Sequence, residues 1–200
     1  EAGRAKRDKA GKIIRDNIWG TLEEDTHRRD FTINALFYCP FSQKIEDHND
    51  GMKHIHEKTI VSIGDPQKRF AEDPVRSLRA IRFSNKLNFK INKDIKEAIY
   101  DKGHLLSDIS NARLFDEFCK IFLKGMAEKN FNKLLSFGLN KYLIETDPEV
   151  NEFTYNLMIE AFRNTDKRLA NNQSVTPGFL IAALLWPQLI EASLQRGEIN

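Results

Sequence analysis

The chain has 200 residues, of which 40% are hydrophobic and 30% charged, and its formal net charge is +2. This composition is ordinary for a globular protein that can bury a core. A net charge this small does not by itself indicate a nucleic-acid-binding protein. Local clustering of charge has to decide that question. No stretch approaches the roughly 18 consecutive apolar residues of a membrane span, and no signal peptide is visible. No membrane partner is therefore expected.

The two cysteines and the first residues indicate the setting of the chain. Cys39 and Cys119 lie far apart and form no CxxC motif, which favours a reducing, cytoplasmic compartment. Residues 1–18 are basic, contain two glycines and lack a sustained period, so we expect a flexible loop there. Because the chain opens without a methionine, we expect it to be a piece of a longer protein.

The first predicted helix spans residues 22–36. Thr21 and Glu24 have the spacing of a capping box, in which the threonine hydroxyl accepts from one free amide and the glutamate bonds back to the cap. Leu22, Phe31 and Leu36 would lie on the apolar side of this helix.

Short strands are predicted after that helix, because the hydrophobic period changes. They cover residues 37–38 and 44–47, on either side of Pro40, and residues 59–63, ahead of a Gly-Asp-Pro turn. From Gln67 the pattern is helical nearly to the end, and Thr176-Pro177 is a plausible start for the last helix. The predicted fold class is mainly α, with a small α/β remnant that leads into a helical body.

The first candidate site is the run of residues 28–34, which reads Arg-Arg-Asp-Phe-Thr-Ile-Asn. On a helix, Asp30 and Asn34 would share one face, with Arg29 beside them. A carboxylate, an amide and guanidinium groups could hold a ribose and phosphates, since arginine donates two hydrogen bonds at once to a phosphate. A solvated helix face with local ion pairs explains the same spacing, and spacing alone favours that alternative.

The second candidate site is residues 72–82. At about 100° per residue, one helix stripe carries four charged side chains and the adjoining stripe carries three apolar ones. The charged side chains are Glu72, Arg76, Arg79 and Arg82. Neighbouring arginines repel each other, so such a stripe favours an anion such as a triphosphate or an RNA backbone. Asp73-Pro74 is also a good helix start, which explains the aspartate but not the arginines.

Other polar residues give weaker signals. The histidines, among them His54 and His56, have no zinc-ligand spacing. The lysines at 86, 90, 93 and 96 favour a solvated helix face, with contact to RNA as the alternative. No Walker loop is present, so the sequence does not support an ATPase of that type.

Three segments, in order, resemble those of class II nucleotidyltransferases, a family of bacterial poly(A) polymerases and CCA-adding tRNA enzymes. Residues 24–36 (EDTHRRDFTINAL) resemble the ribose-recognition motif, and residues 50–53 with 59–64 resemble the next segment. Residues 72–83 (EDPVRSLRAIRF) resemble the nucleobase-recognition motif. Residues 14–21, 164–168 and 177–186 resemble the bacterial poly(A) polymerases rather than the CCA-adding enzymes.

The resemblance implies a role for each matching residue. Asp30 would belong to the catalytic centre, Arg28 and Arg29 would contact the nucleotide, and Asn34 would support the ribose pocket. Asp73 and Arg76 would face the base, with Glu72 orienting Arg76. Arg79 and Arg82 would neutralise the triphosphate. The implied domains are the end of the head (1–66), a neck with RNA-binding residues (67–125) and a truncated helical body (126–200).

The implied reaction is transfer of AMP from ATP to RNA 3′ ends, as in mRNA polyadenylation. Two Mg²⁺ ions would assist it, held by an Asp-x-Asp pair that this chain lacks, as it also lacks the Gly-Gly turn for the triphosphate. No metal ligand is therefore assigned within the chain, and the isolated chain is expected to be inactive. A CCA-adding enzyme and a non-catalytic RNA-binding helical module remain the alternatives.

Overall fold

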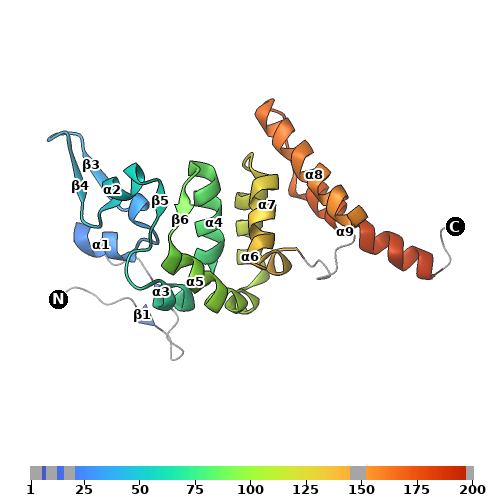
Figure 1. Cartoon of the computed structure of the whole chain (residues 1–200), viewed down its shortest axis with the longest axis horizontal. Coiled ribbons are helices and arrows are strands. Elements are labelled where there is room, and N and C mark those ends of the chain that lie inside the picture. Colours follow the sequence, from blue (N-terminus) through green and yellow to red (C-terminus); the bar gives the residue numbers. More distant parts are fainter. Residues whose placement is uncertain (1–5, 8–12, 16–20, 145–151, 197–200) are drawn as a thin grey trace.

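The computed structural model describes residues 6–7, 13–15, 21–144 and 152–196. It is an elongated molecule, with short strands and helices at one end and long helices at the other (Figure 1). The mainly α fold class, with a small α/β part before a helical body, is confirmed. Among the described residues, no helix is long and apolar enough to cross a membrane.

The first residues include two very short strands where the sequence predicts a loop. β1 (Lys6–Arg7) pairs antiparallel with β2 (Ile13–Arg15). The rest of the expected basic loop, and most of the segment 14–21, lies outside the described residues.

Helix α1 (Leu22–Arg28) begins with the expected capping box but ends eight residues earlier than predicted. The prediction of a helix to Leu36 was wrong because tertiary contacts take over the backbone after Arg28. Asp30 and Thr32 instead form backbone hydrogen bonds with Ile63 and Val61, at 3.1 and 3.0 Å. Phe31 is fully buried there, and a short 3₁₀ turn, η1 (Thr32–Asn34), follows.

Strands lie at the three predicted positions, although the third, predicted over residues 59–63, covers only residues 59–60. A further strand at residues 90–91 was not predicted. β3 (Leu36–Cys39) and β4 (Lys44–Asp47) form an antiparallel hairpin, and β5 (Thr59–Ile60) pairs in parallel with β6 (Lys90–Ile91). Between the hairpin and β5 lies α2 (Gly51–His56). A Cβ atom on Gly51 would lie 2.6 Å from the Thr32 carbonyl oxygen, so only glycine allows α2 to approach η1 this closely.

The remaining elements are almost all helical, as predicted. They are α3 (Pro66–Glu72), α4 (Val75–Leu87), α5 (Lys93–Lys102), η2 (Gly103–Asp108), α6 (Asn111–Phe122), α7 (Ala127–Ser136), η3 (Asn140–Tyr142), α8 (Glu152–Ala170) and α9 (Pro177–Gln195). Helix α4 packs against α6 and α7, α7 packs against α8, and α8 packs against α9. One hydrophobic core runs from Phe31 to Leu184 through these contacts.

Candidate functional site

Helix α4 places its arginines by local periodicity. Val75, Leu78 and Ile81 are at most 1% exposed and face the core, so the arginines at 76, 79 and 82 lie on the adjoining side. The helix begins at Val75, one residue later than the predicted first position. The Asp73 carboxylate accepts from the Val75 amide at 3.3 Å, so this aspartate does help to start the helix.

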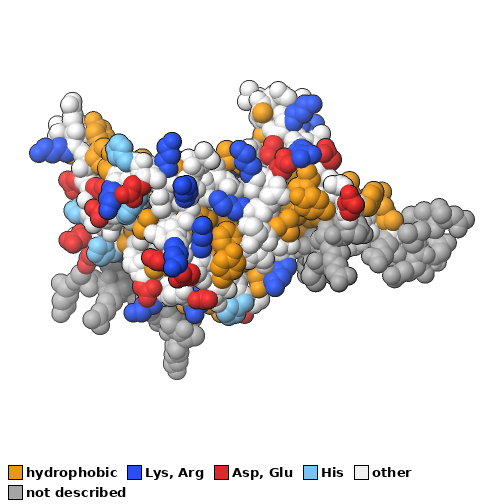
Figure 2. All heavy atoms as spheres, in the orientation of Figure 1, with side chains coloured by type: hydrophobic (Ala, Val, Ile, Leu, Met, Phe, Trp, Pro, Cys, Tyr) orange, Lys and Arg blue, Asp and Glu red, His pale blue; other side chains and the backbone are white. Residues whose placement is uncertain are grey.

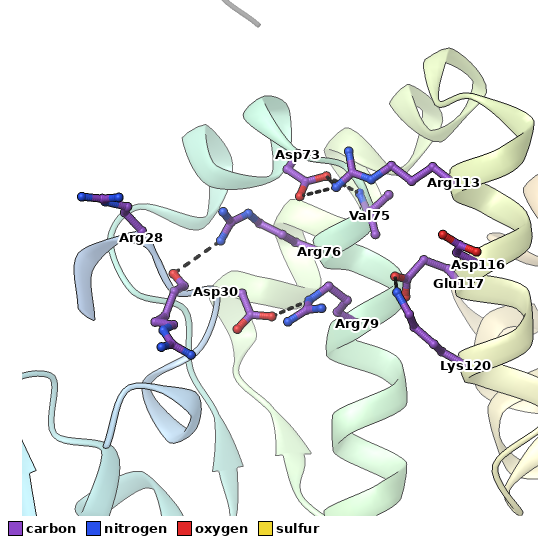
Figure 3. A pocket seen from close by; sticks show the side chains of 11 residues that line it. Arg28, Asp30, Asp73, Val75, Arg76, Arg79, Arg113, Asp116, Glu117 and Lys120 are labelled. Carbon is purple, nitrogen blue, oxygen red and sulfur yellow. Dashed lines mark hydrogen bonds and ion pairs between the residues drawn. The ribbon is translucent and has the colours of Figure 1, made fainter. Parts of the chain in front are cut away.

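A cavity of about 400 Å³ lies beside the first turns of α4. The end of α1 and the following residues form one wall, α4 forms a second and α6 a third (Figure 3). Most of its lining is charged. The lining residues are Arg28, Arg29, Asp30, Asp73, Val75, Arg76, Arg79, Arg113, Asp116, Glu117 and Lys120.

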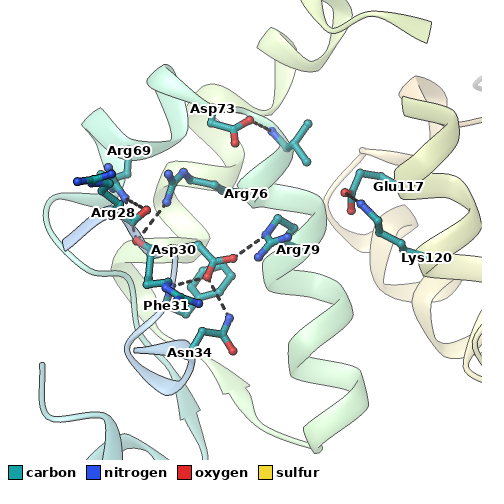
Figure 4. Close-up of polar contacts among 12 residues, drawn as sticks. Arg28, Asp30, Phe31, Asn34, Arg69, Asp73, Arg76, Arg79, Glu117 and Lys120 are labelled. Atoms are coloured by element: carbon teal, nitrogen blue, oxygen red, sulfur yellow. Dashed lines mark hydrogen bonds and ion pairs between the residues drawn. The ribbon is translucent and has the colours of Figure 1, made fainter. Parts of the chain in front are cut away.

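The Asp30 carboxylate is held by several hydrogen bonds at the α1 side of the cavity (Figure 4). Asp30 is 7% exposed, and its carboxylate accepts from Arg79 Nε at 2.6 Å, Asn34 Nδ2 at 3.0 Å and the Phe31 amide at 2.9 Å. Burial by itself raises the pKa of Asp30, but the hydrogen bonds from Arg79 and Asn34 outweigh it and hold the pKa below its usual range. The carboxylate is therefore ionised and fixed near neutral pH.

Arg76 reaches across the cavity toward the end of α1. Its Nη1 lies 3.5 Å from the Arg29 carbonyl oxygen, and its Nε is buried without a hydrogen-bond partner in the part of the chain that is described. Burial lowers the pKa of Arg76, and the nearby Arg69 charge lowers it further. A guanidinium in such surroundings favours an anionic or electron-rich ligand.

Arg69, which the sequence analysis did not single out, holds the cavity wall formed by the end of α1. Its Nη2 donates to the carbonyl oxygens of Arg29 at 2.8 Å and Arg28 at 3.0 Å, where α1 ends. A cation at a helix C-terminus is electrostatically favourable and satisfies free carbonyl groups. Arg69 also lies 3.4 Å from Glu72, so Glu72 contacts Arg69 and acts on Arg76 only through its charge.

Helix α6 supplies the residues that the sequence reasoning missed on the third wall. Arg113 Nη2 donates to both oxygens of Asp73, at 2.9 and 2.8 Å. Glu117 is 4% exposed and bonds Lys120 Nζ at 2.7 Å. The spacing of 113, 117 and 120 puts them on one helix face, which is the signal that could have found them. Only the packing of α6 on α4 shows that this face meets Asp73.

The structure brings most of the predicted site residues together, although Asp30 and Asn34 meet through η1 rather than on a helix. Arg28 and Arg29 line the α1 wall, and Arg29 pairs with Asp25 at 2.9 Å while lying over the Phe37 ring. Asn34 is not a lining residue, but its side-chain amide donates a hydrogen bond to the Asp30 carboxylate. Arg82 is not among the lining residues; its guanidinium lies 4.4 Å from the centre of the Phe83 ring.

The described residues contain no group of three His, Cys, Asp or Glu side chains that could hold a metal ion. Asp30 already accepts three hydrogen bonds, and Asp73 is held by Arg113. The residues of this cavity therefore do not fit a magnesium site by themselves. They do fit an anionic ligand of nucleotide size, because arginine side chains can bind phosphate groups and the acids paired with them fix the direction of each guanidinium.

Comparison with known proteins agrees with this geometry. Residues 2–61 match the family described as "Poly A polymerase head domain", and residues 88–154 match "Probable RNA and SrmB- binding site of polymerase A". Poly(A) polymerase I of Salmonella typhi is 39% identical over 94% of this chain and 41% of its own length. The chain therefore spans about two fifths of that relative.

CCA-adding enzymes match less of the chain. The enzyme of Pediococcus pentosaceus is 39% identical over 61% of this chain and 31% of its own length. The crystal structure of the Bacillus stearothermophilus CCA-adding enzyme in complex with CTP is 32% identical, with a TM-score of 0.58 over 74% of this chain and 35% of that one. The chain belongs to the poly(A) polymerase and tRNA nucleotidyltransferase family.

Proposed function

We propose that the protein containing this chain adds AMP from ATP to RNA 3′ ends without a template. The observation that carries the proposal is the cavity in which the arginines of α4 and α6 are held beside Asp30 and Asp73. The choice of polyadenylation is supported by the relatives, because Poly(A) polymerase I matches 94% of the chain and the CCA-adding enzyme 61%.

Each wall of the cavity has a separate task in this proposal. Arg76 and Asp73 face the adenine, while the α1 wall faces the ribose and Asn34 supports that side of the cavity through its hydrogen bond to Asp30. Arg79 uses Nε to hold Asp30, which leaves its terminal nitrogens for phosphate oxygens. Arg82 contributes through its charge. The RNA 3′-hydroxyl attacks the α-phosphorus of ATP, and pyrophosphate leaves.

Asp30 acts in this scheme by position rather than as a metal ligand, because its oxygens are occupied by Arg79, Asn34 and the Phe31 amide. The magnesium ions expected for such a reaction would be held by other residues of the protein. We also propose that the reaction takes place in the cytoplasm as part of mRNA processing, in keeping with two cysteines that are both free.

The test is primer extension by the full-length protein with magnesium and each nucleotide in turn. We expect ATP alone to extend a single-stranded RNA by many residues. Ordered addition of two C and one A to a tRNA that lacks its CCA end would contradict this and favour a CCA-adding enzyme. No incorporation of any nucleotide, with RNA still bound, would favour a non-catalytic RNA-binding module.

Arg76 provides the residue-level test of the same proposal. Arg76→Ala should reduce the preference for ATP over CTP by about 1–3 kcal/mol, because a polar contact to the base is lost. Arg163→Ala is the matched control, since Arg163 is an exposed arginine that pairs with Glu128 of α7 and with Glu160 of its own helix, α8. An unchanged nucleotide preference in Arg76→Ala would remove Arg76 from base recognition.

A further inference from the structure

Away from the cavity, α5 and the end of α7 bring two aromatic rings together at the surface. Tyr100 lies on α5 and is 63% exposed. Its ring centre is 5.2 Å from that of Phe137, the residue that follows α7, and the two rings are inclined by 43°. Phe137 packs against the core, whereas the tyrosine ring is largely in solvent. Tyr100 therefore presents a flat aromatic surface that the core does not require.

A lysine lies four residues before each of these rings. Lys96 precedes Tyr100 on α5 and Lys133 precedes Phe137 on α7, so each lysine shares a helix face with its aromatic neighbour. In the part of the chain that is described, neither lysine forms an ion pair with an acid. Lys133 Nζ donates to Ser84 Oγ and Asn85 Oδ1, which are both neutral.

The two lysines also act on each other. Burial lowers the pKa of Lys133, and the positive charge of Lys96 lowers it further. Two ammonium groups that repel each other, and that form no ion pair among the described residues, would both be stabilised by an anion between them. The surface thus joins an aromatic face to an anion-binding position.

The segments that directly follow α5 and α7 approach each other closely. A Cβ atom on Gly103 would lie 2.6 Å from Leu139 Cδ2, and Leu139 is only 2% exposed. Because this contact lies three residues after Tyr100 and two after Phe137, it restrains how far the backbones that carry the two rings can move apart. A preformed surface loses less conformational freedom on binding than a mobile one.

We propose that Lys96, Tyr100, Lys133 and Phe137 form a platform for one nucleotide of the RNA strand, upstream of its 3′ end. The base stacks on Tyr100 and the phosphate lies at the two lysines, an arrangement that tolerates any sequence. The proposal rests on the proposed function, for which it names a second contact with RNA. Hydrophobic side chains lie near the middle of the face shown in Figure 2, with lysine and arginine side chains beside them.

RNA suits this platform better than a protein partner does. Lysine is depleted at protein interfaces, whereas single-stranded nucleic acid is bound by aromatic rings combined with positive charge. The four residues also fall within the region 88–154 that matches the RNA- and SrmB-binding family. That match gives a region, and the geometry gives the residues and the chemistry.

The test measures binding of a fluorescent oligoadenylate to the full-length protein by anisotropy at several salt concentrations. Tyr100→Ala should weaken binding about tenfold, and Tyr100→Phe should bind like wild type because the ring is kept. Lys96→Gln should reduce the slope of log K against log salt by about 0.7, the value for one phosphate of a single strand. Lys93→Gln is the matched control, since Lys93 is exposed on the same helix and lies 3.6 Å from Glu97.

Primer extension with ATP is measured on the same protein preparations, at RNA concentrations that saturate the protein. The two proposals can then fail separately. If wild type does not extend RNA but Tyr100→Ala still weakens binding, the transfer activity is refuted and the platform is upheld. If wild type extends RNA while Tyr100→Ala and Lys96→Gln bind it normally, the platform is refuted and a protein partner becomes the better occupant. The three side chains changed here are all exposed, and the unfolding temperature of each variant is checked against wild type.

Discussion

The α7–α8 junction and the charged cavity beside α4 both join segments that are far apart in sequence, but with different chemistry. At the junction, Phe131 and Phe162 are at most 1% exposed and their ring centres lie 4.9 Å apart. The cavity is joined by ion pairs instead, with Arg79 on Asp30 and Arg113 on Asp73. Apolar burial gives stability without direction, whereas charged hydrogen bonds fix the direction of each group at a cost in desolvation.

Polar groups are used differently in the two regions as well. At the junction, Asp166 of α8 accepts from the Ala127 and Glu128 amides, at 2.8 and 3.2 Å, and so caps α7 from another helix. In the cavity, Arg76 keeps a buried Nε without a partner among the described residues. The α7 amides at the junction are thus paired within the protein, whereas in the cavity a buried guanidinium nitrogen is left without a partner among the described residues.

The largest effect should come from the apolar region. Phe162→Ala removes a fully buried ring, which should lower the free energy of unfolding by about 3–5 kcal/mol. Urea denaturation followed by circular dichroism measures this. Phe153→Ala on the same helix is the control, because Phe153 is 64% exposed and its loss should change stability little. Equal effects of the two changes would contradict the assigned core.

Breaking the Asp30–Arg79 pair should have the next largest effect. Asp30→Ala leaves Arg79 without its acid, so we expect a loss of about 3 kcal/mol in the free energy of unfolding. Asp30→Asn keeps the shape of the side chain and should lose less. In the full-length protein both changes should also lower kcat/KM for ATP. A stable, fully active Asp30→Ala protein would show that this pair does not organise the cavity.

Arg113→Ala should have a smaller effect, confined to nucleotide choice. Asp73 would lose the guanidinium that holds both of its oxygens, and we expect the ratio of kcat/KM for ATP to that for CTP to fall by about 1 kcal/mol in free energy. Arg113→Lys keeps the charge but not the paired geometry, so it should restore little of the preference. If only KM for RNA changes, Arg113 belongs to RNA binding instead.

The smallest effect should be the acid dependence of stability. Because the pKa of Asp30 is below its ordinary value in the folded protein, its contribution is complete above the unfolded pKa and is lost as the pH falls through the folded pKa. Stability measured from pH 6 downward should therefore decline less in Asp30→Asn than in wild type. Parallel pH curves for the two proteins would show that Asp30 is not held ionised by Arg79 and Asn34.

Local patterns in the sequence predicted much of this fold correctly. The Thr21–Glu24 capping box, the β3–β4 hairpin and the separate apolar and arginine faces of α4 all depend on residues within one or two turns of each other. Most of the residues proposed for nucleotide binding do line one cavity. The predicted length of α1 was wrong because the apolar residues keep a helical spacing past Arg28, whereas the backbone leaves the helical conformation at that residue.

The sequence by itself determined which residue types are present and which helix faces carry them, since these follow from periods of two and 3.6 residues. Only the tertiary structure decided that Arg69 ends α1, that Arg79 meets Asp30 and that Arg113 meets Asp73. These partners are 40 to 49 residues apart. No local period connects residues at such separations, because their contact depends on the angles at which whole helices pack around the shared core.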